Sequence, residues 1–250
     1  MFSKSVKKVL FLGFIISLSA CSGLGKAPTQ DSFSAKEKLY ESTRNYGGLV
    51  SLYRDALKAN DEPLTRYKLA SSYYKKGDNK SSLLYLSPLL TAQNPLEEKA
   101  GVLQVRNLIQ LQEYDKAISA ANGLIGKYPK NGEIYNLRGI SFAQVGRLAN
   151  AKDDIIKARE LFIDDVTAIN NLAMLSIING DYRNATEILL PQYLNGVKDP
   201  RLIHNLVFAL VKNNDTDYAL DIIRKERLNT SPEDLIASLK QAERILPIGE

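Results

Sequence analysis

Few side chains of this sequence could carry out covalent chemistry. It contains a single cysteine, Cys21, and a single histidine, His204. A Cys–His pair or a Ser–His–Asp triad needs a base beside a nucleophile, and the sequence names no partner for His204. The acid pairs Asp153–Asp154 and Asp164–Asp165 fit solvated helix surfaces better than a catalytic pair of carboxylates. We therefore expect no enzymatic activity, no metal, no cofactor and no small-molecule substrate.

Cys21 itself lies at the end of a basic and then apolar N-terminal segment. Three lysines in residues 1–8 precede the apolar run Val9–Leu18, which is the layout of a secretory signal. A run of about ten apolar residues is too short to cross a bilayer as a helix. A lone cysteine has no disulfide partner, so its place directly after this run needs another explanation.

Acylation is that explanation, because the tetrad Leu18-Ser19-Ala20-Cys21 resembles the lipobox of bacterial lipoproteins. The resemblance implies that residues 1–20 are a signal peptide and that the cysteine becomes the acylated first residue, carrying chains such as palmitate. Several chains anchor a protein durably, whereas one binds only marginally. By the same resemblance, Ser22 favours the periplasmic side of the outer membrane. The alternative is an ordinary cleaved signal with an incidental cysteine.

The charge balance after the cleavage point argues against a nucleic-acid partner. The whole chain has 33 basic and 28 acidic residues, but residues 1–20 hold three lysines and no acid. The remaining net charge is +2, and no basic helix is interleaved with aromatic residues. Residues 21–32 are mostly small and polar, so they predict a flexible tether between the lipid and a folded body.

Alanines recur at an interval of 34 residues along the folded body. The column consists of Ala117, Ala151, Ala185 and Ala219. This period resembles the tetratricopeptide repeat (TPR) family, whose unit is a helix-turn-helix. The resemblance predicts an all-α fold, a solenoid in which helix pairs stack into a right-handed superhelix. We expect five repeats in residues 64–233, at 64–97, 98–131, 132–165, 166–199 and 200–233.

Small residues at fixed places explain how such units pack. The two helices of a unit cross closely, so Gly139 and Ala151 are expected to meet where they cross. Gly146 and Gly180 each follow the first helix of a unit. A left-handed capping residue at that place costs less conformational energy when it is a glycine. One unit cannot bury its own apolar face, so stability comes from stacking. A non-repeating helical bundle, the alternative, leaves the unbroken alanine column unexplained.

The repeat pattern weakens towards both ends. Residues 33–63 predict a degenerate first helical pair, broken at Gly47–Gly48. Two predicted second helices contain prolines and should be shortened or bent. These prolines are Pro88 and Pro191. A helix over 232–245 is expected to close the stack, so that residues 234–250 form most of a capping helix and its tail.

The first helices of TPR units commonly line the concave groove of the superhelix, by family resemblance. The expected groove is basic and polar in the early units and apolar in the late ones. A continuous apolar strip, suited to the apolar face of a partner helix, is expected from Ile140, Met174, Ile177, Phe208 and Val211. The polar groove residues are Asn136, Asn170, Arg201 and His204. Alternatively, the closing helix fills the strip.

Several short motifs within residues 166–245 resemble more than a generic repeat. They are Asn170-Asn171-Leu172-Ala173, Gly180-Asp181-Tyr182, Leu189-Leu190-Pro191, and Pro200-Arg201 with Asn205-Leu206-Val207. These motifs are similar to those of the TadD family, the repeat lipoproteins of the tight-adherence (Flp pilus) secretion system. The family's usual glycine after Asn-Asn-Leu is Ala173 here. The likeness covers about a third of the chain, and the remainder matches only as repeats.

The TadD resemblance implies a pilotin-like assembly factor on the inner leaflet of the outer membrane. Such a protein binds the secretin, the subunit that forms the outer-membrane pore, or another pilus-assembly subunit. A tethered binder would act by raising the local concentration of its partner at one membrane. Two alternatives remain open at this point. One is a pilotin of another pilus or secretion system, and the other is an envelope adaptor that scaffolds peptidoglycan enzymes or outer-membrane protein assembly.

Overall fold

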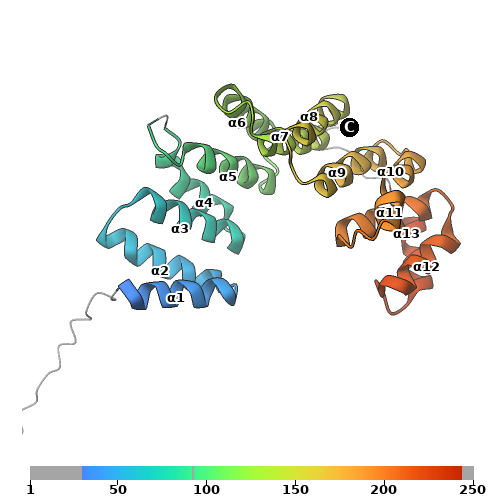
Figure 1. The fold of residues 1–250 in the computed structure, drawn as a ribbon, viewed down its shortest axis with the longest axis horizontal. Helices are drawn as coiled ribbons and strands as arrows, with labels where there is room; N and C mark the ends of the chain where they lie inside the picture. The colour runs from blue at the N-terminus through green and yellow to red at the C-terminus, as the bar shows by residue number, and fades with distance from the viewer. Residues whose placement is uncertain (1–29, 92, 244–250) are drawn as a thin grey trace, which may run out of the picture.

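The structure is a computed structural model that describes residues 30–91 and 93–243. Within these ranges the chain forms thirteen α-helices and one short 3₁₀-helix, with no strand (Figure 1). None of the helices described is long and apolar enough to cross a membrane. The predicted signal peptide, Cys21 and nearly all of the predicted tether lie outside the described residues.

The helices follow one another as antiparallel pairs along the chain. The N-terminal half contains α1 (Gln30–Ser42), α2 (Tyr46–Ala59), α3 (Pro63–Lys76), α4 (Asn79–Leu86), η1 (Ser87–Leu89), α5 (Glu97–Gln110) and α6 (Tyr114–Lys127). The C-terminal half contains α7 (Gly132–Gln144), α8 (Leu148–Glu160), α9 (Asp165–Ile178), α10 (Tyr182–Leu194), α11 (Pro200–Lys212), α12 (Thr216–Glu226) and α13 (Pro232–Gln241).

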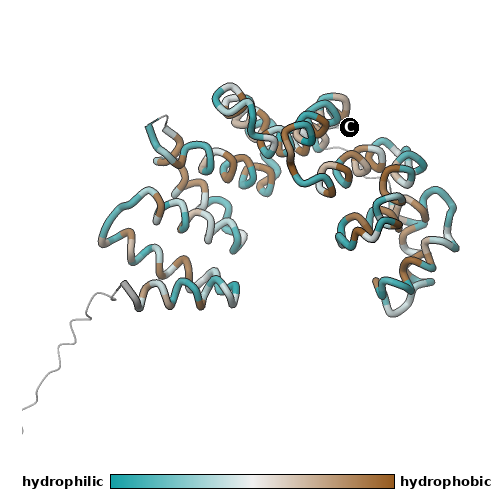
Figure 2. Tube along the Cα trace, in the orientation of Figure 1, coloured by the Kyte–Doolittle hydropathy of each residue, from teal (hydrophilic) through white to brown (hydrophobic). Residues whose placement is uncertain are grey.

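The pairs stack into an arch (Figure 1). Each second helix packs on the next first helix, as α8 does on α9 and α10 on α11. On the right of Figure 1, α10 and α12 lie on the outer side of the arch. Polar and apolar residues alternate along the helices (Figure 2), so that each helix buries one face. The buried side chains form a series of clusters between neighbouring helices.

The alanine column marks the closest helix crossings, as predicted. Its four alanines have no exposed surface at all. A Cβ atom on Gly139 would lie 3.1 Å from the carbonyl oxygen of Ala151 and 3.0 Å from Ile155, so α7 and α8 leave no room for one. Gly146 and Gly180 both have φ of +76° after their first helices, which confirms the predicted left-handed caps.

The first helical pair differs from the prediction in where it breaks. The chain turns at residues 43–45, and Gly47 and Gly48 lie inside α2. The reason is a side-chain cap: the Oδ1 of Asn45 accepts a hydrogen bond from the Gly48 amide at 2.9 Å and starts the helix there. Gly48 is needed because the ring of Tyr40 lies against its Cα. Helix α1 also begins earlier than expected, within the predicted tether.

The two prolines have different effects on their helices. Helix α4 ends at Leu86 and passes into the 3₁₀-turn that contains Pro88, so this second helix is shortened as predicted. Pro191 instead lies inside α10, which continues to Leu194, and the helix is not shortened. At the C-terminal end, α13 stops at Gln241, before the predicted limit of 245, and packs against α11 and α12.

Candidate protein-binding surfaces

The predicted apolar strip is not continuous, which corrects the expectation from the sequence. Ile177 and Val211 are each only 1% exposed. Ile177 packs in a cluster with Ala185 and Ala209, and Val211 shares a buried cluster with Ile236 of α13. The closing helix therefore covers the C-terminal end of the strip, in agreement with the alternative stated for it. These two side chains stabilise the stack and are not available to a partner.

The other apolar strip residues are half-buried. Ile140 and Met174 are partly covered by their own stack. The ring of Phe208 meets the ring of Tyr182 edge-to-face, with centroids 6.0 Å apart, and the ammonium of Lys212 lies 5.8 Å from the Phe208 centroid. Contacts within the chain thus satisfy much of the surface that the sequence assigned to a partner helix.

The two asparagines predicted for the groove link neighbouring units. Asn136 accepts a hydrogen bond from the amide of Asn171 at 2.8 Å, and Asn170 accepts one from Asn205 at 2.9 Å. Each bond joins residues 35 positions apart, so the pair forms a polar ladder along the first helices. Sequence reasoning missed Asn171 and Asn205 as partners, although their spacing from Asn136 and Asn170 was a signal for them.

Arg201 and His204 are the predicted groove residues that remain exposed. The guanidinium of Arg201 pairs with Asp199 at 2.8 Å, and this bond to Asp199 raises the pKa of Arg201. Asp199 also caps α11 through the amides of Arg201 and Leu202. Arg201 is therefore held at the start of its helix, whereas His204 is free to contact a partner.

The face formed by first helices is hollowed in the N-terminal and central units. Two cavities of about 570 and 490 Å³ lie there. Arg106, Asn131 and Glu133 line both, so the two adjoin in one elongated depression, which we call the first-helix cleft. Its aromatic and basic lining residues are Tyr67, Tyr74, Lys75, Lys99, Lys130 and Phe162. Lys75 and Lys99 occupy groove positions expected from the repeat register, whereas Tyr67, Tyr74, Lys130 and Phe162 were not expected there.

The basic residues that line the first-helix cleft outnumber its carboxylates, Glu98, Glu133 and Asp164, by four to three. Arg106 forms an ion pair with Glu133 where the two cavities meet. Among the described residues, Lys75, Lys99 and Lys130 form no ion pair with a carboxylate. The ammonium of Lys75 lies 6.0 Å from the ring centroid of Tyr46. The cleft thus offers three lysines to a carboxylate that another molecule would bring.

Phe162 is the most exposed large apolar side chain described, at 95%. It lies in the turn between α8 and α9 with φ of +62°, a left-handed conformation that is rare for a bulky residue. Gly196, 34 residues later, has φ of +89° at the same place in its unit. The turn therefore needs a left-handed residue, and the chain uses an exposed phenylalanine where the next unit uses glycine.

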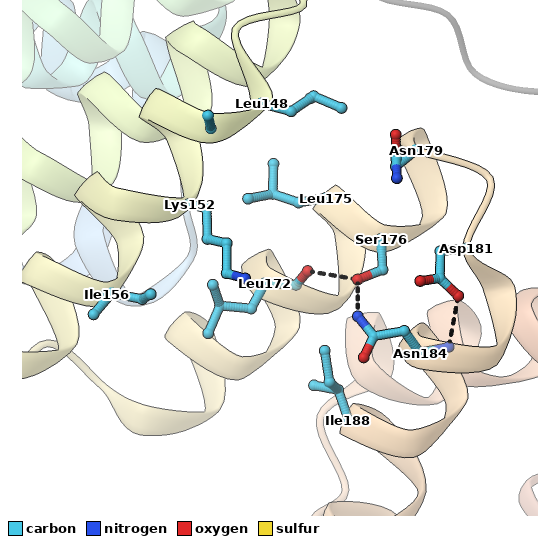
Figure 3. A pocket seen from close by; sticks show the side chains of 11 residues that line it. Leu148, Lys152, Ile156, Leu172, Leu175, Ser176, Asn179, Asp181, Asn184 and Ile188 are labelled. Carbon is cyan, nitrogen blue, oxygen red and sulfur yellow. Dashed lines mark hydrogen bonds between the residues drawn. The ribbon is translucent and has the colours of Figure 1, made fainter.

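A further depression of about 460 Å³ lies between α8, α9 and α10, which we call the α8–α10 pocket (Figure 3). Its apolar lining residues are Leu148, Ile156, Leu172, Leu175 and Ile188. On its polar side, the amide of Asn184 donates to the hydroxyl of Ser176 at 2.7 Å. The ammonium of Lys152 extends over the apolar floor beside Leu172 (Figure 3) and has no carboxylate partner among the described residues.

Within residues 30–91 and 93–243, no three His, Cys, Asp or Glu side chains are grouped so that they could hold a metal ion. Burial raises the pKa of the Tyr67 phenol, which lines the cleft. The chemistry available is recognition through charge, hydrogen bonds and apolar contact.

Several solved structures of other proteins share the architecture of this chain. A thermophilic TPR protein from Thermus thermophilus is 22% identical, covering 73% of this chain and 98% of its own, with a TM-score of 0.60. A TPR protein from Parabacteroides merdae is 16% identical, covering 84% and 83%, with a TM-score of 0.66. The fold is a TPR solenoid. The Cut9–Hcn1 hetero-tetramer of the APC/C also contains it, at 17% identity, 84% and 46% coverage and a TM-score of 0.63.

Comparison of the amino-acid sequence with known proteins gives weaker matches than comparison of the structure. No protein-family model matches the chain. A curated relative, the peptidyl-prolyl cis-trans isomerase FKBP42 of Arabidopsis thaliana, is 26% identical over 155 residues, which are 61% of this chain. Those residues span only 40% of that protein.

Proposed function

We propose that this TPR solenoid is a scaffold that holds a segment of a partner protein in the first-helix cleft. The observation that carries the proposal is the set of unpaired lysines, Lys75, Lys99 and Lys130. The exposed ring of Phe162 and the half-buried rings of Tyr67 and Tyr74 line the same cleft. A segment that combines carboxylates with apolar or aromatic side chains is complementary to such a surface. Charge at the rim speeds the encounter, and the rings contribute most of the contact energy.

We further propose that the scaffold is tethered to the outer membrane through lipid on Cys21 and faces the periplasm. The Leu18-Ser19-Ala20-Cys21 tetrad supports this anchor. Labelled palmitate should be incorporated by cells that express the chain, and Cys21→Ser should abolish the incorporation. Unlabelled protein in both cases would contradict the anchor while leaving the scaffold proposal intact.

The partner we propose is the secretin, or another assembly subunit, of a Flp pilus system, which makes the chain a pilotin-like factor. The TadD-like motifs in residues 166–245 support this assignment. In the structure these motifs build the solenoid: Asn170 and Asn205 form a ladder bond, and Asp181 caps α10. We assign recognition of the partner to the first-helix cleft, whose lining residues lie outside these motifs.

The test is co-purification of the secretin with the tagged full-length chain. Lys75→Glu combined with Lys99→Glu should reduce the recovered secretin about tenfold, because two attractive charges become repulsive. The control reverses Lys58 and Lys116, which lie outside the cleft with exposed side chains, and should bind as the original chain does. Circular dichroism should show equal helix content in all three proteins.

Two outcomes would overturn parts of the proposal. Equal recovery of the secretin with both double variants would exclude the first-helix cleft as the binding site. Recovery of peptidoglycan enzymes or outer-membrane assembly proteins instead of the secretin, lost again in the cleft variant, would retain the cleft but replace the partner. That result would favour an envelope adaptor.

A further inference from the structure

The α8–α10 pocket lies where one junction of the solenoid differs in composition from the junction before it. Between α6, α7 and α8, Arg138 spans the junction and donates to Asp154 at 2.6 and 2.7 Å and to Asn122 at 2.7 Å. The side chains 34 positions later are all aliphatic: Ile156, Leu172 and Ile188. They form no such bridge, and a hollow of about 460 Å³ lies among them.

Aliphatic side chains at the same places are buried one junction later. There Leu206 and Ile222 are 0% and 1% exposed. In the α8–α10 pocket, by contrast, Ile156 is 39% exposed, and Ile156 and Ile188 lie on either side of Leu172 (Figure 3). Aliphatic side chains that are grouped in a hollow and left in contact with water are typical of a site that another molecule covers.

The charged groups of the pocket lie on opposite sides of it. Among the described residues, two charged side chains line the pocket, Lys152 and Asp181 (Figure 3). The exposed ammonium of Lys152 has no carboxylate partner in that part of the chain. The exposed carboxylate of Asp181 caps α10 by accepting a hydrogen bond from the backbone amide of Asn184 at 3.0 Å. The pocket thus presents a positive and a negative group with aliphatic surface between them.

We propose that the α8–α10 pocket binds an amphipathic helix of a partner protein. A helix fits the shape, because α8 and α10 supply the two sides of an open trough and α9 supplies its floor (Figure 3). Aliphatic side chains one turn apart on the partner helix cover the apolar floor. An acidic residue at one end of that helix meets Lys152, and a basic residue at the other end meets Asp181.

The same charges determine the direction of the partner helix. Acidic residues stabilise a helix when they lie in its first turn, and basic residues when they lie in its last turn. A partner helix that begins at Lys152 and ends at Asp181 satisfies both conditions, whereas the opposite direction satisfies neither. The proposal therefore specifies the partner's pattern as an acidic start, an aliphatic row and a basic end.

The pocket is a second surface, separate from the first-helix cleft, because the two share no lining residue. A scaffold with both surfaces occupied would hold two protein segments at once. The pocket can therefore bind its helix whether or not the cleft binds the secretin, and the two proposals are tested independently.

A variant with a closed pocket provides the matched control. The triple substitution Ile156→Asn, Leu172→Arg and Ile188→Asp copies the bridge of the preceding junction, which the same solenoid already accommodates. Circular dichroism should show the helix content of the original chain.

A displayed library of helical peptides is the probe. Peptides of about 18 residues are long enough to form a helix. Those selected on the full-length chain, and counter-selected against the closed-pocket variant, should carry an acidic residue in the first turn and an aliphatic row after it. A library without enrichment, or enriched peptides that lack the acidic residue, would overturn the proposal.

Charge exchange with an enriched peptide tests the direction, with fluorescence anisotropy as the measurement. Lys152→Glu should weaken binding of the peptide about tenfold, and replacing the first-turn acid of the peptide with lysine should restore it. Lys116→Glu on α6, whose side chain is also exposed, should bind the peptide as the original chain does. Equal affinities of the Lys152→Glu and Lys116→Glu chains would overturn the proposal. This comparison needs only exposed side chains, so it holds even if the closed-pocket variant does not fold.

Two further outcomes would overturn the proposal by assigning the pocket to a different occupant. One is self-association in sedimentation velocity that the closed-pocket variant abolishes, which would assign the pocket to a second copy of the chain. The other is binding of dodecanoate that Lys152→Glu abolishes, without enrichment of any peptide, which would assign it to a fatty acid.

Discussion

Phe162 combines two features that each cost stability in isolation. Its left-handed backbone costs a non-glycine residue about 1–2 kcal/mol, and its ring is almost wholly in water. It also lines the first-helix cleft. Backbone strain of this kind is concentrated where binding or catalysis requires a particular side chain. An exposed aromatic ring held in a strained turn is therefore well placed to anchor a partner.

The prediction for Phe162→Gly is that stability and binding change in opposite directions. The substitution copies Gly196 of the next unit and should raise the free energy of unfolding by about 0.5–1 kcal/mol, because the strain is larger than the entropy cost of glycine. Secretin recovery should fall. Urea unfolding and co-purification measure the two effects. A loss of stability would show that the ring makes favourable contacts in the free chain.

At the residue scale, the sequence predicted small side chains better than binding ones. Ala151 and Gly139 were predictable because the backbones of two helices approach so closely that only small residues fit. Ile177 was assigned to the groove by its place in the unit alone. Its burial depends on Ala185 and Ala209, residues from other helices, and only the assembled stack shows that contact. Lys75 and Lys99 were assigned to the basic early groove by their places in the unit, whereas Lys130, which lies in the turn before α7, was not.

At the scale of the helix, glycines in similar helices serve different purposes. Gly139 in α7 touches α8, whereas a Cβ atom on Gly123 in α6 would meet nothing within 4 Å. Helix propensity alone favours alanine over glycine by about 1 kcal/mol at either place. The packing between helices decides which substitution is tolerated.

We expect Gly139→Ala to destabilise the chain by about 1–3 kcal/mol, since the new methyl group forces α7 and α8 apart. Gly123→Ala should stabilise it by about 1 kcal/mol. The midpoints of urea unfolding distinguish the two. Similar effects of both substitutions would mean that the crossing of α7 and α8 can adjust to an extra carbon.

Element boundaries were predictable where local chemistry determines them. Helix α3 ends at Gly77 and α4 ends before Pro88, and both signals lie in the sequence. The break before α2 was misplaced because a glycine pair suggests a turn, while the capping side chain of Asn45 starts the helix two residues earlier. Pro191 does not shorten α10, which continues through it for three more residues, and a bend at this proline stays a prediction.

At the scale of the whole molecule, ion pairs between helix ends depend on acid carboxylates. The Lys127 ammonium and the Tyr128 hydroxyl hold the pKa of Glu97 below its ordinary value, and Tyr128 donates to Glu97 at 3.0 Å. Lys198 and Tyr193 likewise hold the pKa of Glu226 below its ordinary value. The Tyr193 hydroxyl donates a hydrogen bond to the Glu226 carboxylate at 2.8 Å. The same arrangement thus secures two distant parts of the stack.

Stability should therefore fall in acid. A carboxyl group with a lower pKa in the folded state stabilises the fold above its unfolded pKa, near 4.5 for glutamate, and loses this contribution as the pH falls through the folded value. The free energy of unfolding, measured in urea, should decrease below about pH 4.5. The double variant Glu97→Gln and Glu226→Gln should show a shallower decrease. An unchanged slope would contradict the assignment.

The division of the buried side chains into clusters has a mechanical consequence. Among residues 30–91 and 93–243, no central core ties α1 to α13, so each junction transmits load only to its neighbours. A force that pulls the two ends of the arch apart would be shared among the junctions in series. The molecule would then lengthen elastically as the curvature of the arch opens, before any helix pair unfolds.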